Sequence, residues 1–349
     1  MFQLFTNNKP AQVGVAVSLS ILIVANVIGN ILVILIILTN KSMKSPMNYL
    51  LVNLAVADMI VGVFLAPQYV FISFFTHPDG VAGKMLCKVL TGGLFAWIGA
   101  SASSFTLVSV ACERYFAIVH PYSIKLKLNM KRLKLIVIFC WPYALLLTFP
   151  SFFTLDFSKD LQLCMEQWSM QPLWVATTYS TLWLIFVGVI PISIMFVLYS
   201  RVIYSLWFKQ NQVQGTQLAV LKSRKRVTKM MVIVSVVYAA SWLPILLVYH
   251  NSQFDNDPTL LAAKIPFVAS VVLSACNSAI NPFVYTLQSE RFRRLLMELL
   301  RCRKQRQNCI AIINRESLPT KSAKLPSLEG QSIELAKTTN DQKGVPGST

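Results

Sequence analysis

Seven long runs of apolar residues, separated by short polar segments, extend from residue 12 to residue 287. Each run can cross a bilayer, because roughly 20 apolar residues at about 1.5 Å per residue span a hydrocarbon core of about 30 Å. The predicted spans cover residues 12–38, 48–75, 85–118, 132–154, 173–207, 227–250 and 261–287. The pattern predicts an all-α membrane protein, in which a seven-transmembrane helix bundle forms a single domain.

Shorter segments flank this bundle, which occupies residues 12–287. Residues 1–11 are expected to form an extracellular amino terminus, and no cleavable signal peptide is evident. Residues 288–301 are basic and amphipathic, which predicts a short eighth helix along the membrane surface. Residues 302–349 are polar and predict a disordered tail.

Polar residues lie deep inside several runs, where lipid would penalise them, and such positions are functional by default. Asp58 lies in the middle of the second span, and a carboxyl group at that depth must be protonated, paired or bound to a cation. Its expected neighbours are polar residues of spans one, three and seven: Asn30, Ser103, Asn277, Ser278 and Asn281. One carboxylate with these oxygens suits an allosteric Na⁺ ion. A protonated Asp58 that is hydrogen-bonded for packing is the alternative.

Composition agrees with a membrane protein, since 55% of the residues are hydrophobic and only 13% are charged. The net charge of +18 is distributed unevenly along the chain. Five of the 32 basic residues (Lys9, Lys84, Lys88, Lys159 and Lys264) lie in the amino terminus and the even-numbered loops, and the other 27 lie at the opposite face. This positive-inside bias predicts an outside amino terminus and a cytoplasmic carboxyl terminus, and it argues against a nucleic-acid partner.

The seven cysteines divide between the two sides of this topology. Cys87 and Cys164 are placed on the oxidising outer side, at the start of span three and in the second outer loop, and they are predicted to form a disulfide. Cys302 directly follows the amphipathic segment and is a candidate palmitoylation site, with Cys309 as a second candidate. The disulfide would tie the second outer loop across the outer end of the bundle.

Short motifs follow one another in a fixed order along the spans. Glu113-Arg114-Tyr115 closes the third span, and prolines interrupt spans five, six and seven. The other motifs are Gly29-Asn30, Leu54 to Asp58, Trp141, Pro191 with Tyr199, Trp242-Leu243-Pro244, and Asn281-Pro282-Phe283-Val284-Tyr285. Together with Cys87, this set resembles the rhodopsin-like (class A) G protein-coupled receptors over nearly all seven spans. The second outer loop, Cys164 to Trp168, is most similar to that of the neuropeptide receptor group.

The resemblance implies a location and a mechanism. The protein would lie in the plasma membrane, and activation would release Arg114 to contact a heterotrimeric G protein, with Tyr199 and Tyr285 in support. Trp242 would couple ligand binding to an outward motion of span six. The resemblance implies further switch residues: Glu113, Tyr115, Pro121, Tyr122, Tyr238, Pro244, Asn281 and Pro282. Basic residues at the foot of span six would face the G protein and anionic membrane lipids. Serines and threonines of the tail would be phosphorylated by receptor kinases and would bind arrestin.

Three features depart from the family pattern. The foot of span six is basic around Arg224, so it offers no acid to pair with Arg114 in the resting state. Below the ligand pocket the chain has Ser104 and Tyr238 in place of an aliphatic residue and a phenylalanine, so a polar contact would set the resting bias. Cys87 precedes Arg114 by 27 residues, about two more than is usual, which predicts a bulge or a shifted start of the third helix.

The ligand class is predicted from what the spans lack and from what the outer mouth contains. No acid lies between Asp79 and Glu113 to pair with a biogenic amine, and span seven has no mid-depth lysine for a retinal Schiff base. The candidate ligand contacts are polar, acidic or aromatic: Gln68, Trp97, Glu166, Trp168, Tyr179 and Tyr249. They favour a neuropeptide. A small neutral ligand (nucleoside- or melatonin-like), a lipid mediator, and constitutive activity without a ligand are the alternatives.

Other classes of membrane protein lack their required residues in this sequence. An intramembrane protease needs paired carboxylates, a Ser/His pair or a His-Glu-x-x-His zinc site, and the three histidines lie at span ends or in loops. A channel would show charged rings inside the spans, and many transporters show broken, inverted halves. The chain is therefore predicted not to be an enzyme.

Overall fold

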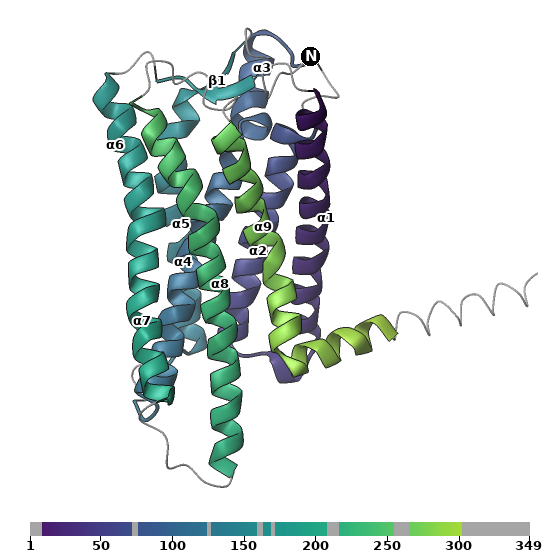
Figure 1. Ribbon diagram of the computed structural model, residues 1–349, viewed down its shortest axis with the longest axis vertical. Coiled ribbons are helices and arrows are strands. Elements are labelled where there is room, and N and C mark those ends of the chain that lie inside the picture. The colour runs from purple at the N-terminus through teal and green to yellow at the C-terminus, as the bar shows by residue number, and fades with distance from the viewer. Residues whose placement is uncertain are drawn as a thin grey trace, which may run out of the picture. The chain divides into compact units, whose positions relative to one another are not determined.

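Helices form most of the computed structural model, which describes residues 9–71, 76–123, 127–158, 163–168, 172–207, 216–254 and 265–301. Within these ranges, seven helical segments are long and apolar enough to cross a membrane. They are Val13–Thr39, Pro46–Tyr69, Gly80–Val119, Met130–Thr154, Trp174–Trp207, Lys222–Ser252 and Pro266–Gln288. Their helices lie side by side (Figure 1), which confirms the predicted seven-helix bundle.

The first two spans are the helices α1 (Lys9–Thr39) and α2 (Pro46–Tyr69), which are joined through a 3-10 turn at Lys41–Met43. The sequence supplies clear signals for the start of α2. Pro46 stands in its first turn, and the Ser45 side chain accepts a hydrogen bond from the Asn48 N–H at 3.3 Å. The helix ends before the predicted limit of residue 75, and residues 72–75 lie outside the described chain.

Span three is divided into the helix α3 (Gly80–Leu86), a π-helical segment (Cys87–Thr91) and the helix α4 (Leu94–Val119). Gly92 and Gly93 separate the last two pieces. Gly93 has a φ of 72°, a left-handed conformation that glycine adopts without strain. The unusual spacing between Cys87 and Arg114 is therefore absorbed by a bulge followed by a break, as one of the two predicted explanations requires.

The remaining spans show two further irregularities. Their elements are α5 (Met130–Thr154), then α6 (Leu173–Trp183), a π-helical segment (Leu184–Val189) and α7 (Ile190–Trp207), then α8 (Thr216–Ser252) and α9 (Ile265–Gln288). Span five thus contains a second π-helical bulge, directly before Pro191. The helix α8 begins well before the predicted span of 227–250, so its basic foot extends beyond the neighbouring helices (Figure 1).

An antiparallel β-hairpin covers one end of the bundle, with β1 (Leu155–Ser158) paired to β2 (Leu163–Glu166). A disulfide joins Cys164 of β2 to Cys87 of span three, with their Cα atoms 5.5 Å apart. This bond confirms the predicted pairing. It fixes the hairpin across the entrance to the bundle.

An ion pair adds a second tie between the hairpin and span three. Lys84 Nζ lies 3.0 Å from Asp156 Oδ2. Burial raises the pKa of Asp156, but hydrogen bonds from Lys84 and from the Phe157 N–H lower it by more, with help from the charges of Lys84 and Lys88. The pKa of Asp156 therefore lies below its ordinary value, and the carboxylate is charged at neutral pH.

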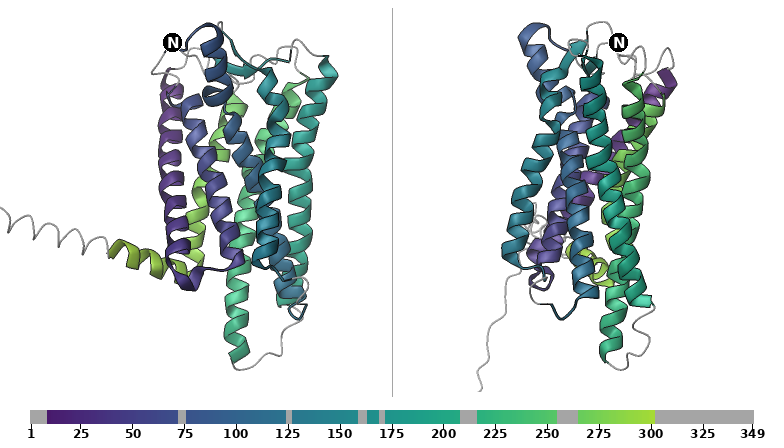
Figure 2. Two further views of the ribbon diagram at one scale, coloured as in Figure 1. Left: turned by 180° about the vertical axis from the view of Figure 1, so that it is seen from behind. Right: turned by 90° about the vertical axis from the view of Figure 1, so that its left-hand side faces the viewer.

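A further helix over residues 290–301 follows α9 at the end opposite the hairpin and turns away from the bundle axis (Figure 2). Phe292 is buried, and its ring centroid lies 6.3 Å from that of Tyr285. Arg291 Nη2 donates to the carbonyl oxygen of Ser42 at 2.8 Å. The predicted eighth helix is thus present, and one of its faces packs on the bundle.

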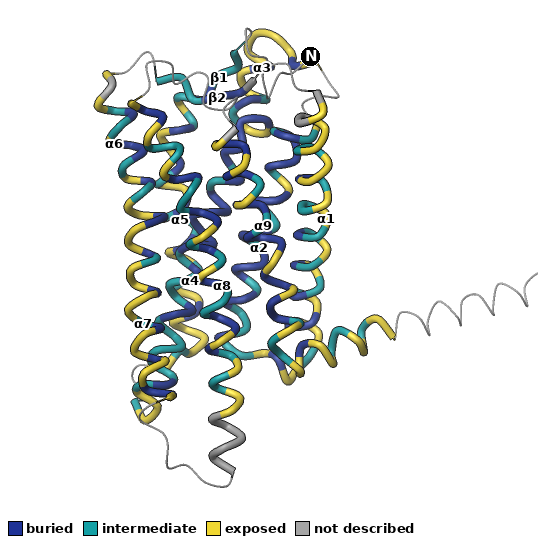
Figure 3. The backbone as a smooth tube through the Cα atoms, in the orientation of Figure 1, coloured by how far each residue is buried: buried dark blue, intermediate teal, exposed yellow. Residues whose placement is uncertain are grey.

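The distribution of buried side chains is that of a protein surrounded by lipid (Figure 3). Large apolar side chains such as Ile21, Leu146 and Phe196 are exposed on the outward faces of the helices. Polar side chains such as Asn30 and Asp58 are buried completely. The interior of the bundle therefore holds the polar network that the sequence predicts.

Candidate functional site

Glu166 lies at the hairpin end of the bundle, where β2 meets spans four, five and six. Its carboxylate accepts hydrogen bonds from Ser151 Oγ at 2.5 Å, from the Tyr249 hydroxyl at 2.5 Å and from Trp168 Nε1 at 3.1 Å. The Tyr179 hydroxyl lies 2.7 Å from Ser151 Oγ. One acidic group thus holds the hairpin against α5, α6 and α8.

Four of the six predicted ligand contacts meet around this carboxylate: Glu166, Trp168, Tyr179 and Tyr249. The other two lie elsewhere. Trp97 is deeper in the bundle, and Gln68 of α2 packs against Gly93, where an added Cβ would meet Gln68 Oε1. Ser151 is a member of the cluster that the sequence does not identify, because a serine within an apolar span has no pattern of its own.

A column of aromatic rings leads from Glu166 into the bundle. Six rings follow one another with centroids 5.2 to 6.4 Å apart, in the order Trp168, Tyr179, Trp183, Trp97, Trp242 and Tyr238. Such separations are those of aromatic side chains in direct contact. The column connects the cluster around Glu166 with Trp242, the residue predicted to couple ligand binding to the motion of span six.

A small, mostly apolar cavity lies beside this column. Residues of α2, α4, α8 and α9 line it, including Tyr69, Trp97, Trp242 and Ser274. Trp242 is only 2% exposed, and its Nε1 has no hydrogen-bond partner in the described part of the chain. The cavity is about large enough for a single water molecule, so a ligand group could enter only if the surrounding side chains moved.

Asp58 lies fully buried in the middle of the bundle, and other helices hold its carboxylate. Oδ1 accepts from Ser103 Oγ at 3.2 Å and from Ser278 Oγ at 3.1 Å, and Oδ2 accepts from Asn281 Nδ2 at 2.6 Å. The side chain of Asn277 is also buried, and neither its oxygen nor its nitrogen is bonded within the described residues. Three of the four residues of the predicted sodium site thus bond directly through Asp58.

The atoms of this cluster fit a hard monovalent cation. In addition to the carboxylate and the two hydroxyls, the amide oxygens of Asn30, Asn277 and Asn281 are buried without a partner in the described ranges. Hard cations prefer such oxygen ligands. The described residues contain no group of three or more His, Cys, Asp or Glu side chains that could hold a metal ion. Asp58 thus supplies the one carboxylate of this cluster, and the other candidate ligand atoms are uncharged oxygens.

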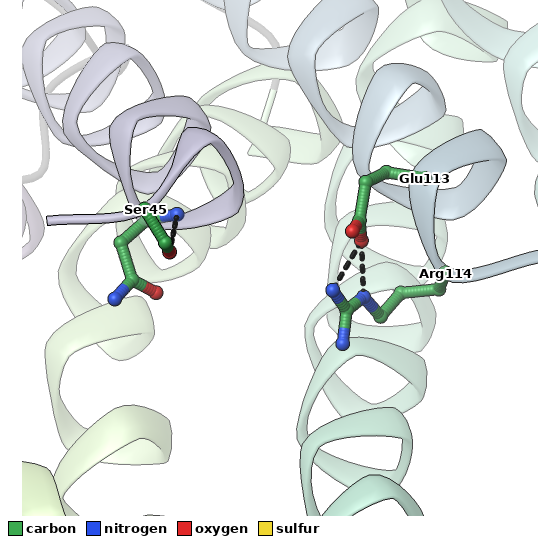
Figure 4. A network of polar contacts seen from close by, with 4 residues as sticks. Ser45, Glu113 and Arg114 are labelled. Atoms are coloured by element: carbon green, nitrogen blue, oxygen red, sulfur yellow. Dashed lines mark hydrogen bonds and ion pairs between the residues drawn. The ribbon is translucent and has the colours of Figure 1, made fainter. Parts of the chain in front are cut away.

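The motif Glu113-Arg114-Tyr115 lies close to the end of α4, at the opposite end of the bundle from the hairpin. Nε and Nη2 of Arg114 both contact Glu113 Oε2, so the guanidinium is held by its neighbour in the sequence (Figure 4). The hydroxyls of Tyr199 and Tyr285, its predicted supports, are buried and unbonded within the described chain. Neither hydroxyl is bonded to Arg114 in this structure.

Two exposed features lie at the same end of the bundle as Arg114 (Figure 1). Pro121 and Tyr122 follow α4, and Tyr122 is 96% exposed, as a contact for a partner protein would be. Arg226, at the foot of α8, places Nη2 at 2.8 Å from Glu290 Oε1 in the helix 290–301. The hydrogen bond and the charge of Arg226 hold the pKa of Glu290 below its ordinary value. The foot of α8 thus pairs with the helix after span seven instead of with Arg114.

Several predicted residues lie outside the described chain. They include Cys302, the candidate palmitoylation site, and the serines and threonines of residues 302–349. Cys309, the second candidate, also lies outside it. The predictions for these residues stay predictions.

Comparison with known proteins gives consistent matches. A family model described as "7 transmembrane receptor (rhodopsin family)" matches residues 29–285. The chain is 28% identical over 305 residues to the QRFP-like peptide receptor of Branchiostoma floridae, and this alignment covers 82% of this chain and 77% of that protein. It is 29% identical over 320 residues to neuropeptide FF receptor 1 of Homo sapiens, with 86% and 73% covered. It is also 29% identical over 314 residues to the thyrotropin-releasing hormone receptor of Gallus gallus, with 80% and 76% covered.

Proposed function

Because the chain belongs to the rhodopsin family of seven-transmembrane receptors, we propose that it binds an extracellular neuropeptide and in response activates heterotrimeric G proteins. The members of this family are multi-pass plasma-membrane receptors and not enzymes. The observation that carries the ligand class is the position of Glu166, an acidic group at the entrance to an aromatic column. A peptide that presents a basic residue beside an aromatic or amidated end is complementary to both.

Ligand binding would begin with an exchange of partners at Glu166. A guanidinium or ammonium group of the peptide would replace a neutral donor such as the Tyr249 hydroxyl, since charge-assisted hydrogen bonds are roughly twice as strong as neutral ones. Tyr249 lies on α8, the helix that also carries Trp242. Its release from Glu166 would therefore act on the helix that must move. The aromatic rings from Trp168 to Trp97 would receive the apolar part of the peptide.

Signalling would then follow as a shift between two populations of the receptor. An agonist must bind the arrangement with an open cytoplasmic end more tightly than the closed one, because only differential affinity shifts an equilibrium. In the arrangement described above, Glu113 holds Arg114, and Arg226 pairs with Glu290. Both contacts would break as α8 moves outward. Arg114 would then contact the G protein, with Tyr199 and Tyr285 in support.

The sidedness of the membrane follows from charge in this proposal. The hairpin end, with its disulfide, would face outside, and the end that carries Arg114 and the basic foot of α8 would face the cytoplasm. The helix 290–301 would lie on anionic lipid, with Cys302 as its palmitoylation site. The tail would serve as the substrate of receptor kinases and as the binding segment for arrestin.

We also propose that Na⁺ binds at Asp58 as an allosteric cofactor. Asp58 would supply the negative charge, and Ser103, Asn277 and Asn281 would supply uncharged oxygens. The ion would add electrostatic stabilisation to the arrangement in which these four residues lie together. An agonist that favours a different arrangement would then bind less tightly in the presence of Na⁺.

A functional assay tests the proposal directly. The receptor is expressed with a promiscuous Gα subunit, and second messenger is measured against a panel of amidated neuropeptides. We expect at least one peptide to act at nanomolar concentration, and we expect Arg114→Ala to abolish the response at equal surface expression. Silence of the native receptor despite surface expression would contradict the peptide assignment. A response to nucleosides, indoles or lipids, or a high basal signal, would then assign one of the alternatives.

A further inference from the structure

The bulge in span five leaves two backbone carbonyl groups without their usual helical partners. The α-helical partner of Val187 O would be residue 191, but Pro191 has no N–H to donate. The partner of Phe186 O would be Ile190, whose N–H instead donates to Ile185 O across the π-helical turn. Two neighbouring carbonyl oxygens therefore need donors from elsewhere, because lipid offers none.

Two tyrosines from different helices supply these donors. The hydroxyl of Tyr143, on α5, donates to Phe186 O at 2.8 Å. The hydroxyl of Tyr238, on α8, donates to Val187 O at 2.6 Å. The bulge is thus bonded on one side to span four and on the other side to span six. Each bond is made by a group that no repeating sequence pattern singles out.

The two bonds differ in what they connect. Tyr143 is partly exposed, and it lies on a helix for which no motion is proposed. Tyr238 is completely buried, and it lies between the basic foot of α8 and Trp242, the ring it packs against at 6.2 Å. Gly188, next to Val187, allows a close approach of α8, since an added Cβ there would lie 3.0 Å from Leu246 Cδ1. The Tyr238 bond thus connects α8, the helix that must move, with span five, which α8 contacts.

The hydroxyl of Ser104 lies close to that of Tyr238. It is buried near Tyr238 and has no hydrogen-bond partner within the described residues. A tyrosine hydroxyl has a single proton to donate, and here that proton goes to Val187 O. The oxygen of the same hydroxyl faces Ser104 and can accept a hydrogen bond from it, so Tyr238→Phe removes the bond to the bulge together with this neighbour of Ser104.

We infer that the hydrogen bond from Tyr238 to Val187 O is a resting-state restraint, which α8 must give up in order to move away from span five. The inference rests on the proposed function, since it concerns the motion that would admit a G protein. A bond that exists in the resting arrangement alone stabilises that arrangement alone. Its loss shifts the population toward the open arrangement without any ligand.

The test compares Tyr238→Phe with Tyr143→Phe in the full chain, reconstituted in lipid nanodiscs. Each variant removes the tyrosine hydroxyl that donates to one of two adjacent carbonyl groups. Distances between spin-labelled noncanonical residues at positions 131 and 224 report the position of the α8 foot without a G protein. Nucleotide exchange on purified Gα, measured without ligand, reports signalling. Melting temperatures report how much stability is lost when each bond is removed.

We expect Tyr238→Phe to raise the ratio of open to closed distances, and the basal exchange rate, by roughly two- to tenfold, the factor for one neutral hydrogen bond. Tyr143→Phe should lower the melting temperature about as much as Tyr238→Phe does. It should leave the ratio of open to closed distances and the basal exchange rate unchanged. If Tyr238→Phe leaves the distances as in the native receptor, or if both variants shift them equally, the restraint is refuted. A shift in distance with no exchange in any variant would keep the restraint and refute the proposed coupling to G proteins.

Discussion

His77 and Phe157 stack face to face at the hairpin end of the bundle, with ring centroids 3.8 Å apart and an angle of 6° between the ring planes. Phe157 belongs to β1, whereas His77 precedes α3. His77 is 7% exposed, and its Nε2 lies 3.2 Å from Thr91 Oγ1 and 3.6 Å from Cys164 Sγ. The stack therefore joins the hairpin, the disulfide and span three around one imidazole ring.

Stability should depend on pH through His77. Burial lowers the pKa of His77, and the hydrogen bond with Pro78 O and the charge of Asp79 offset only part of this effect. The unfolded chain then binds a proton more readily than the folded one, so stability is lost as pH falls below about 6.5, the ordinary value. We expect a lower melting temperature at about pH 5.5 than at about pH 7.5. His77→Phe retains an aromatic ring against Phe157 but cannot be protonated, so its melting temperature should change less. Equal pH dependence in both proteins would contradict this account.

Glu166 should determine the affinity for a basic peptide. Glu166→Gln keeps the size of the side chain and one acceptor oxygen but removes the charge. We expect the potency of an activating basic peptide to fall about 10- to 100-fold, the factor for one hydrogen bond to a charged group. Tyr249→Phe is the matched control, because it removes a neutral donor from the same carboxylate and leaves the charge in place. The same peptide should be equally potent or more potent on Tyr249→Phe than on the native receptor. Dose–response curves that are unchanged in Glu166→Gln would exclude a role of this charge in binding.

The features that sequence predicts well are those that lipid makes unavoidable. A carboxyl group such as Asp58 cannot remain unpaired at the middle of a span, so its polar neighbours could be named from depth alone, and Ser103, Ser278 and Asn281 bond to it. The disulfide followed from a similar constraint, since the predicted outer side offered Cys87 only one partner, Cys164. Features of this kind can be predicted without knowing how the helices pack.

The backbone irregularities could not be predicted from the pattern of apolar and polar residues. The long interval before Arg114 indicated extra residues in span three but not that Gly92 and Gly93 would carry the break. Nothing marked the bulge before Pro191. A polar contact of Tyr238 was predicted, but its acceptor, Val187 O, was not, and Tyr143 was not identified at all. An aromatic residue in an apolar span fits a lipid face, a core or a polar bond equally well. Only the positions of the neighbouring helices decide among these.

Gly93, at the break in span three, should be sensitive to substitution. Its φ of 72° lies in the left-handed region, where other residues lose roughly 1–2 kcal/mol, and an added Cβ would also meet the Gln68 side chain. We expect Gly93→Ala to lower the free energy of unfolding by at least about this amount and to lower surface expression. Gly14→Ala is the control, since a Cβ there meets nothing within 4 Å. It should leave the melting temperature unchanged or slightly higher. A melting temperature of Gly93→Ala equal to that of the control would mean that the break adapts to a side chain.

Asp58→Asn tests the sodium site. The substitution keeps the size of the side chain and one acceptor for Ser103 and Ser278, but it removes the charge that would attract the ion. In the native receptor, about 100 mM NaCl in place of choline chloride should weaken agonist binding by at least about fivefold, a typical coupling between two sites. In Asp58→Asn the two salts should give the same affinity. Asp156→Asn removes a carboxylate at the hairpin end instead, and it should retain the sodium effect because it leaves the cluster intact. A sodium effect that survives in Asp58→Asn would place the ion elsewhere, and its absence from the native receptor would remove Na⁺ from the mechanism.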